Sequence, residues 1–249
     1  MIRPLALITG SFRRLGGHIA TRLVQAGYDV ALHASHPGEP DAAVVAAIAA
    51  AGAEHHCFAA DLADADAARA LIPAVAARFG RGVSLLVNNA SCFRADDAGY
   101  PTSESLTAHY AVNAAAPFVL ATMLAGQGGS AVVNILDQRI AHPHRDQLAY
   151  TLSKQALAEA TRTLALALAP RVRVNGVAPG LTLATDDYSP EQVDRLAALM
   201  PLGRLPDVDQ VADAVLFLAG ADASTGQIMF VDGGAGLVSF DRDFVHLAR

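Results

Sequence analysis

The sequence is poor in the residues that mark secreted and nucleic-acid-binding proteins. Two cysteines among 249 residues, Cys57 and Cys92, are too few for a disulfide framework. Only 17% of the residues are charged, the formal net charge is -6, and no run of Lys or Arg predicts the basic face that nucleic-acid binders share. We therefore expect neither a disulfide-stabilised secreted domain nor a nucleic-acid partner.

Long hydrophobic runs and metal-ligand motifs are also lacking. No stretch approaches the roughly 18 uncharged apolar residues that a membrane span needs. The apolar part of residues 1–10 is too short for a signal peptide. The nine histidines are scattered, and pairs such as His55 and His56 lack the spacing of metal ligands on a helix. We expect a cytoplasmic protein with no metal and no membrane partner.

Hydrophobic residues make up 53% of the chain, which is enough for a large core. The predicted strands cover 5–9, 28–33, 54–59, 84–87, 131–135, 173–177 and 228–231, and the predicted helices 15–26, 41–51, 64–79, 104–125, 147–169, 190–200 and 208–219. Apolar strands that alternate with helices favour a parallel sheet covered on both faces. We predict an α/β fold in a single domain (1–249), a Rossmann-type doubly wound parallel sheet of about seven strands. A phosphate-type loop after the first strand favours this open sheet over an eight-unit barrel.

The segment from Thr9 to Gly16 joins the first predicted strand to the first predicted helix. Gly10 permits a tight turn, and Gly16 lets the start of the helix lie close to the sheet. Free N–H groups and the helix dipole favour a pyrophosphate there. The alternative is an ordinary strand–helix turn. We predict that this loop, including Leu15, binds a dinucleotide.

The residues around this loop favour NADP(H) over NAD(H). Arg13 and Arg14 supply two cations in the loop, although both could be solvated surface residues. An NAD-binding protein typically has an acid about 20 residues after the glycines. The segment His33, Ala34, Ser35, His36 has none, which leaves room for a 2′-phosphate that Ser35 and His36 could bind.

Tyr150 and Lys154 are four residues apart at the start of a predicted helix, so both lie on one face. A phenol has a pKa near 10, and a neighbouring ammonium lowers that pKa by favouring the phenolate. The pair predicts a tuned proton donor for a hydride reduction, and Lys154 could also hold the nicotinamide ribose. The alternative is an exposed helix face.

With these motifs the chain resembles the short-chain dehydrogenases/reductases over nearly its whole length. The motifs that carry the resemblance, in the family's order, are Thr9-Gly10 with Gly16, Asn88-Asn89-Ala90, Asn113, Tyr150 with Lys154, Asn175, Pro179-Gly180 and Asp232-Gly233-Gly234. The family implies a homodimer or homotetramer that uses NAD(P). It implies that Asn113 supports a proton relay through water to Lys154, although turn or helix-kink chemistry is the alternative for this asparagine. It places Asn89 and Ala90 along the cofactor, Asp61 and Leu62 at the adenine, and Pro179, Gly180 and Thr182 at the nicotinamide.

The chain departs from most of the family at Asp137, 13 residues before Tyr150, where a serine is usual. An ionised carboxylate only accepts hydrogen bonds and would repel the alkoxide formed from a ketone. A nitrogen heterocycle with N–H donors suits it better, and a buried Asp137 could also retain a proton. Arg139 either pairs with Asp137 or faces solvent.

Within the family, the chain is most similar to pteridine reductases and dihydromonapterin reductases. They share the aspartate, a loop like Thr9–Gly16, and an Asn-Ala-Ser-x-Phe segment that Asn89–Phe93 matches. The resemblance implies that Phe93 stacks on a pterin, that Ser91 and Arg14 contact the pterin or the cofactor phosphates, and that Asp137 and Tyr150 support protonation of the ring. The alternative for Phe93 is a core or lid residue.

Three functions remain open: an NADPH-dependent pterin reductase, a reductase of another carbonyl, imine or quinone-like ring, and a cofactor-binding regulatory protein with a decayed site. Residues 181–202, beginning at Leu181 and including Asp186 and Asp187, suit a substrate lid. The tail from Phe240 to the C-terminus either reaches a neighbouring subunit or frays.

Overall fold

A seven-stranded parallel sheet organises the chain in the computed structural model, which describes residues 2–93, 100–184 and 188–248. The strand order is β3-β2-β1-β4-β5-β6-β7. The strands are β1 (Leu5–Ile8), β2 (Asp29–Ala34), β3 (His55–Ala59), β4 (Leu85–Asn88), β5 (Ala131–Ile135), β6 (Arg173–Pro179) and β7 (Ile228–Val231). The order reverses between β1 and β4, and in such sheets ligands bind at this point, beyond the carboxyl ends of the strands.

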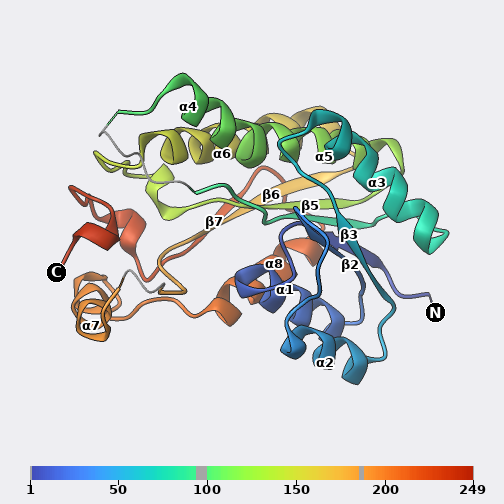
Figure 1. Cartoon of the computed structure of the whole chain (residues 1–249), viewed down its shortest axis with the longest axis horizontal. Coiled ribbons are helices and arrows are strands. Elements are labelled where there is room, and N and C mark those ends of the chain that lie inside the picture. Colours follow the sequence, from blue (N-terminus) through green and yellow to red (C-terminus); the bar gives the residue numbers. More distant parts are fainter. Residues whose placement is uncertain (1, 94–99, 185–187, 249) are drawn as a thin grey trace.

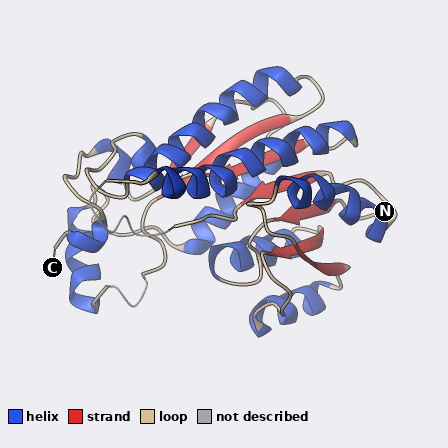
Figure 2. Cartoon of the chain, turned by 45° about the horizontal axis from the view of Figure 1, so that its top comes forward, coloured by secondary structure: helices blue, strands red, loops and turns tan. Residues whose placement is uncertain are grey.

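Helices cover both faces of the sheet, as Figure 1 and Figure 2 show. One face carries α1 (Arg14–Gln25), α2 (Ala42–Ala51) and α8 (Val208–Gly220), and the other carries α3 (Ala65–Phe79), α4 (Ser103–Tyr110), α5 (Ala116–Gly126) and α6 (Leu148–Leu168). Each face has its own apolar core, because both sides of β1, β4 and β5 are buried. The predicted doubly wound sheet is confirmed.

The predicted helix over residues 104–125 is interrupted in the structure. A π-helical turn, η1 (Ala111–Ala115), separates α4 from α5 and contains Asn113. By length and mean hydropathy, the whole run Ser103–Gly126 is long and apolar enough to cross a membrane. Polar residues interrupt this run, so it contains no continuous apolar stretch of that length. Half of its most apolar window is buried, and Leu120 and Leu124 pack in the core against the sheet, as expected for a core helix.

Two segments near the C-terminus build a smaller layer beside the carboxyl edge of the sheet. It contains α7 (Pro190–Leu199) and a tail with two short 3-10 turns, η3 (Ala235–Leu237) and η4 (Phe244–His246). In Figure 1 this layer lies at the left, near the start of α6. Phe244 is buried with Leu196 and Met200, so the tail packs on its own chain rather than fraying.

Candidate active site

A cavity of about 290 Å³ opens at the carboxyl ends of the strands. Eleven of the residues predicted for the site line it: Arg14, Leu15, Asn89, Ser91, Asp137, Tyr150, Lys154, Pro179, Gly180, Leu181 and Thr182. They come from the start of α1, from the loops after β4 and β5, from the end of β6 with the loop that follows it, and from α6. The fold therefore brings together residues that are far apart in the sequence.

The loop after β1 is held by close backbone contacts that need glycine. A Cβ on Gly16 would lie 2.1 Å from the Gly10 carbonyl oxygen and 2.6 Å from Nδ2 of Asn89. That Nδ2 donates to the carbonyls of Thr9 and Gly10, both at 2.9 Å. The Thr9 hydroxyl accepts from the backbone N–H groups of Asn89 and Ala90. Asn89 thus ties the loop after β4 to the loop after β1.

His33 supports this loop. The absence of an acid in the segment after the second strand predicts that His33, with Ser35 and His36, contacts the cofactor, and the structure corrects this for His33. Its ring is buried, Nδ1 accepts from the Gly10 N–H at 3.2 Å, and Nε2 lies 2.9 Å from the Ala60 carbonyl. The first bond requires an unprotonated Nδ1, so Nε2 carries the proton and donates to Ala60. Burial lowers the pKa of His33, which keeps the ring neutral. Both nitrogens are occupied, so His33 shapes the loop and offers nothing to a phosphate.

Polar side chains at the end of β2 remain available to a cofactor phosphate. Ser35 and His36 are exposed, and their side chains lie 2.9 Å apart. Arg13 and Arg14 are exposed at the start of α1, and neither forms an ion pair within the described residues. Arg14 has a left-handed backbone (φ +53°), which is uncommon for a residue other than glycine, and it lines the cavity.

Asp61 and Leu62, the two residues expected at the adenine, follow β3 and differ in exposure. Asp61 is exposed beyond β3, and its Oδ1 accepts from the Ala63 N–H at 3.0 Å. Leu62 is buried in the core. Their contacts with an adenine stay a prediction.

Tyr150 and Asp137 form the chemical centre of the cavity. The Tyr150 hydroxyl donates to Oδ2 of Asp137 at 3.1 Å. Burial raises the pKa of Tyr150 well above its usual range, the Asp137 carboxylate raises it further, and Arg139 opposes the shift. The predicted lowering of this pKa by Lys154 is therefore wrong: desolvation and a carboxylate favour the neutral phenol.

Arg139 pairs with Asp137 and does not face solvent. It is 7% exposed, its Nε lies 3.1 Å from Oδ1 of Asp137, and its Nη2 lies 2.6 Å from Oδ2 of Asp243. Its guanidinium carbon lies 4.9 Å from the centre of the Tyr150 ring. Burial alone would lower the pKa of Arg139, but the two carboxylates outweigh it and raise that pKa. The guanidinium stays charged, and Asp137 is held as an acceptor.

Lys154 lies beneath the phenol with little compensation for its charge. It is 2% exposed, its Nζ donates to the Ile135 carbonyl at 2.9 Å and lies 5.7 Å from the centre of the Tyr150 ring. Burial lowers the pKa of Lys154 to about 8, Asp137 opposes the shift and Arg139 adds to it. An ammonium with spare donors is suited to bind hydroxyl groups of a ligand.

Asn113 fixes the segment that carries Ser91 and Phe93. Its Oδ1 accepts from the Cys92 N–H at 2.6 Å and from the Ser91 hydroxyl at 3.3 Å. Its Nδ2 donates to the Cys92 carbonyl and to the Ser153 hydroxyl, both at 2.9 Å. These contacts occupy the side-chain amide, and the proton relay to Lys154 stays a prediction.

Phe93 contacts Tyr150 but is not among the residues that line the cavity. Its ring is 54% exposed and meets the Tyr150 ring edge-to-face at 4.9 Å between centres. It is not a core residue, and it offers an aromatic surface next to Tyr150.

Sequence reasoning missed the contribution of the C-terminal tail. Asp243 and Phe244 line the cavity together with Tyr188 of the predicted lid. Asp186 and Asp187, also expected in the lid, lie outside the described residues. An acid among aromatics in a terminal segment has no distinctive spacing, so no pattern could have singled out Asp243. Among the described residues, no group of three His, Cys, Asp or Glu side chains could hold a metal ion.

A family model described as enoyl-(acyl carrier protein) reductase matches residues 10–236. The chain belongs to the short-chain dehydrogenase/reductase family. The crystal structure of FolM alternative dihydrofolate reductase 1 from Brucella canis, complexed with NADP, is similar to this reductase with a TM-score of 0.85, 36% identity and coverage of 94% of this chain and 95% of that one.

Two curated relatives are similar over almost the whole chain. Pteridine reductase 1 from Leishmania tarentolae is 34% identical and covers 94% of this reductase and 96% of its own length. A granaticin polyketide synthase putative ketoacyl reductase from Streptomyces violaceoruber is 33% identical, with coverage of 94% and 97%. The reductase uses NADP(H). The loop at Gly10 and Gly16, the exposed side chains of Arg13 and Arg14, and the absence of an acid from residues 33–38 fit this cofactor.

Proposed function

We propose that this reductase transfers a hydride from NADPH to a dihydropterin, with Tyr150 as the proton donor. The observation that carries the proposal is the pairing of Tyr150 with Asp137, at the position where most of the family has a serine. The similarity to a pteridine reductase and to an alternative dihydrofolate reductase supports it.

The cofactor, when bound, supplies the hydride. Within the chain, Arg14 and the N–H groups at the start of α1 would hold its pyrophosphate, and Ser35 and His36 its 2′-phosphate. Lys154 would bind the ribose beside the nicotinamide, and Pro179, Gly180 and Thr182 would border the ring.

The remaining chemistry belongs to the side chains. Reduction of a carbon–nitrogen double bond places the hydride on carbon and needs one proton on nitrogen. The raised pKa of Tyr150 keeps a proton on its hydroxyl. Asp137, paired with Arg139, accepts hydrogen bonds and so suits the N–H groups of a pterin. Phe93 offers a ring for stacking, worth about 0.5–1.5 kcal/mol beyond its buried area.

NADPH oxidation with dihydrobiopterin, dihydromonapterin and dihydrofolate tests this proposal. We expect turnover of at least one of them, faster with NADPH than with NADH. A β-ketoacyl thioester, an imine and a quinone are the comparison substrates, because a putative ketoacyl reductase is among the relatives. Turnover confined to these comparison substrates would discard the pterin and keep the family and the cofactor.

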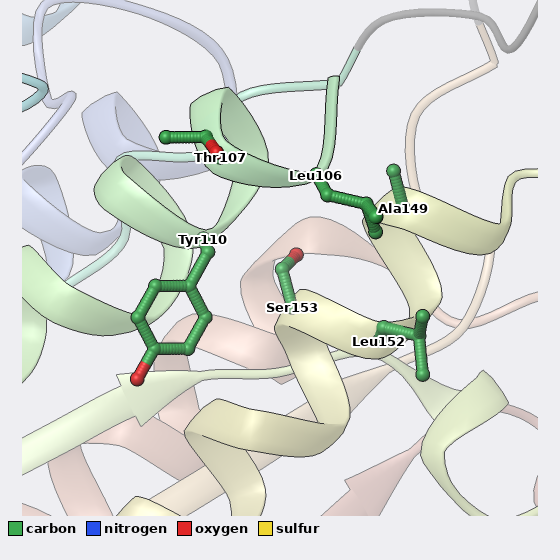
Figure 3. A pocket seen from close by; sticks show the side chains of 6 residues that line it. All are labelled: Leu106, Thr107, Tyr110, Ala149, Leu152 and Ser153. Atoms are coloured by element: carbon green, nitrogen blue, oxygen red, sulfur yellow. The ribbon is translucent and has the colours of Figure 1, made fainter. Parts of the chain in front are cut away.

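We also infer that the reductase is a cytoplasmic homodimer or homotetramer that associates through α4 and α6. A pocket of about 300 Å³ lies between these helices and is lined by Leu106, Tyr110 and Leu152 among others. Figure 3 shows these side chains. Tyr110 is 55% and Leu152 53% exposed. Exposed apolar side chains gathered on neighbouring helices are typical of a protein interface.

A further inference from the structure

The C-terminal tail docks on the loop that carries Asp137. Arg145 in this loop pairs with Asp241 at 2.8 Å. Asp146 in the same loop accepts from the Asp243 N–H at 2.8 Å and from Nε of Arg242 at 3.4 Å. In Figure 1 the red tail lies beside α7 and close to the beginning of α6.

Asp243 differs from the other charged residues of the tail because it is buried. It is 4% exposed, whereas Asp241 and Arg242 are exposed. Its Oδ2 accepts from Nη2 of Arg139 at 2.6 Å, and its Oδ1 accepts from the Val245 N–H at 2.9 Å. The turn η4 therefore fixes the orientation of this carboxylate.

A continuous row of charged and polar contacts joins the tail to the proton donor. Nη2 of Arg139 donates to Asp243, and Nε of the same guanidinium donates to Asp137, which accepts from the Tyr150 hydroxyl. Asp137 also accepts from the Arg139 backbone N–H at 2.9 Å. Two carboxylates that bind two nitrogens of one planar guanidinium restrict its orientation, and that orientation positions the Asp137 carboxylate that accepts from Tyr150.

Anchoring the tail does not require Asp243. Nε2 of Gln192 on α7 donates to the carbonyls of Phe244, Val245 and Leu247. Phe244 is buried in the apolar cluster with Leu196. Burying a carboxylate and a guanidinium is costly, and a well-packed apolar pair often serves stability as well or better. The buried charge at position 243 is therefore best explained by the chemistry of the site.

We propose that Asp243 is a positioning residue of this reductase: it holds Arg139 so that Asp137 stays aligned on the Tyr150 hydroxyl, which makes the C-terminal tail part of the active site. The inference rests on the proposed role of Tyr150 as proton donor and is independent of the identity of the substrate.

A titration of Lys154 tests the proposal without any substrate. Lys154 is the only lysine in the chain, so lysine labelled with nitrogen-15 or carbon-13 gives a single side-chain signal in NMR spectra. Asp243→Asn removes a negative charge beside Arg139 and leaves the site more positive, so the Lys154 pKa should fall by about half a unit or more. Asp241→Asn, which removes the exposed partner of Arg145 in the same tail, is the matched control and should leave that pKa unchanged.

Kinetics give the second readout, with whichever substrate the wild type reduces. In Asp243→Asn we expect kcat to fall about tenfold or more, in the range of general acid–base effects, with unchanged affinity for NADPH. The basic limb of the pH profile should move to lower pH together with the Lys154 titration. Folded Asp243→Asn protein with the wild-type kcat and the wild-type Lys154 pKa would overturn the proposal.

Because breaking a buried ion pair can unfold a protein, a double variant provides the alternative. Arg139→Met with Asp243→Leu removes both charges and keeps an apolar contact. We expect it to fold, bind NADPH and have a reduced kcat, and a wild-type kcat would overturn the proposal. A wild type that reduces no pterin would instead contradict the substrate proposal alone, since the Lys154 titrations in the two single variants would still decide the role of Asp243.

Discussion

The pKa of Tyr150, the proposed proton donor, is shifted in the direction opposite to the one that its spacing from Lys154 suggests. In the chain alone, burial and the Asp137 carboxylate favour the neutral phenol, so the hydroxyl proton is present at neutral pH. Burial lowers the pKa of Lys154 to about 8, and its Nζ donates to the Ile135 carbonyl. If Tyr150 is the proton donor, as we propose, its proton is already in place before the reduction begins.

Removing the phenol hydroxyl should abolish turnover and spare cofactor binding. Tyr150→Phe keeps the ring that contacts Phe93 and Arg139 but has no proton to donate, so we expect kcat to fall about 10²–10⁴-fold. Stopped-flow kinetics and NADPH titration measure the two effects. Tyr100→Phe, at an exposed position outside the cavity, is the control. A Tyr150→Phe enzyme with wild-type kcat would show that Tyr150 is not the acid.

The buried charge of Lys154 should lower the free energy of unfolding of the protein. Its pKa is lowered from 10.5 to about 8, so the folded state binds the proton more weakly than the unfolded state does. The cost is fully present below about pH 8 and disappears as the pH rises toward 10.5. At neutral pH it amounts to about 3 kcal/mol, because one pKa unit corresponds to about 1.4 kcal/mol.

Lys154→Met should therefore raise the melting temperature of the cofactor-free protein at neutral pH while abolishing turnover. The gain should shrink as the pH increases above about 8. Lys154→Arg, which keeps the buried charge, should show no gain. A Lys154→Met protein that melts below the wild type would contradict this assignment of the buried charge.

An acid at the end of β2 should reverse the cofactor preference. His36→Asp places a carboxylate where the 2′-phosphate of NADPH is expected, and like charges a few ångströms apart repel by about 1–3 kcal/mol at partly exposed sites. We expect KM for NADPH to rise roughly ten- to hundredfold. NADH, which lacks this phosphate, is the internal control in steady-state assays. An equal change for both cofactors would place the 2′-phosphate elsewhere.

Among the elements, the π-helical turn shows how the site depends on irregular structure. It places Asn113 where a regular helix would not, with its amide bonded to Cys92, Ser91 and Ser153. Asn113→Ala leaves buried polar groups without partners and should destabilise the protein by about 1–3 kcal/mol. It should also raise the substrate KM, because Ser91 and Phe93 lose their support.

Asn175→Ala provides the matched control for this prediction. Asn175 is equally buried, and its amide bonds to the Ser224 carbonyl and the Gln227 N–H near the opposite end of β6. Asn175→Ala should lower the free energy of unfolding, measured with denaturant, by a similar amount and leave the substrate KM unchanged. If both variants changed KM alike, the effect of Asn113 would be one of general stability.

The elements themselves could be predicted because their signals are local. Uniformly apolar strands such as Leu5–Ile8 and the glycines at the helix ends depend on neighbours in the sequence, and the structure confirms them. The π turn, the buried support by His33 and the tail contact of Asp243 depend on residues distant in sequence. No period or spacing encodes such contacts, so only the folded chain could reveal them.

At the scale of the whole molecule, the strand order places the candidate catalytic residues at one edge of the sheet, and an apolar surface lies on α4 and α6. Helix α6 takes part in both, because Tyr150 and Lys154 face the cavity while Leu152 faces outward with Leu106 and Tyr110. A two-fold association through this surface would pack α4 and α6 of one subunit on the same helices of another, as isologous interfaces do.

Leu152→Glu should disrupt this association. In a two-fold interface, the new carboxylates of the two subunits would be buried together and would repel each other. The mass measured by sedimentation should therefore fall to half that of the wild type or less. Val45→Glu, on exposed α2 across the sheet, should leave the mass unchanged. Because Leu152 lies between Tyr150 and Lys154 on one helix, dissociation should also lower kcat as that helix loses its packing. A monomeric wild type, or a Leu152→Glu variant of unchanged mass, would place the interface on another surface.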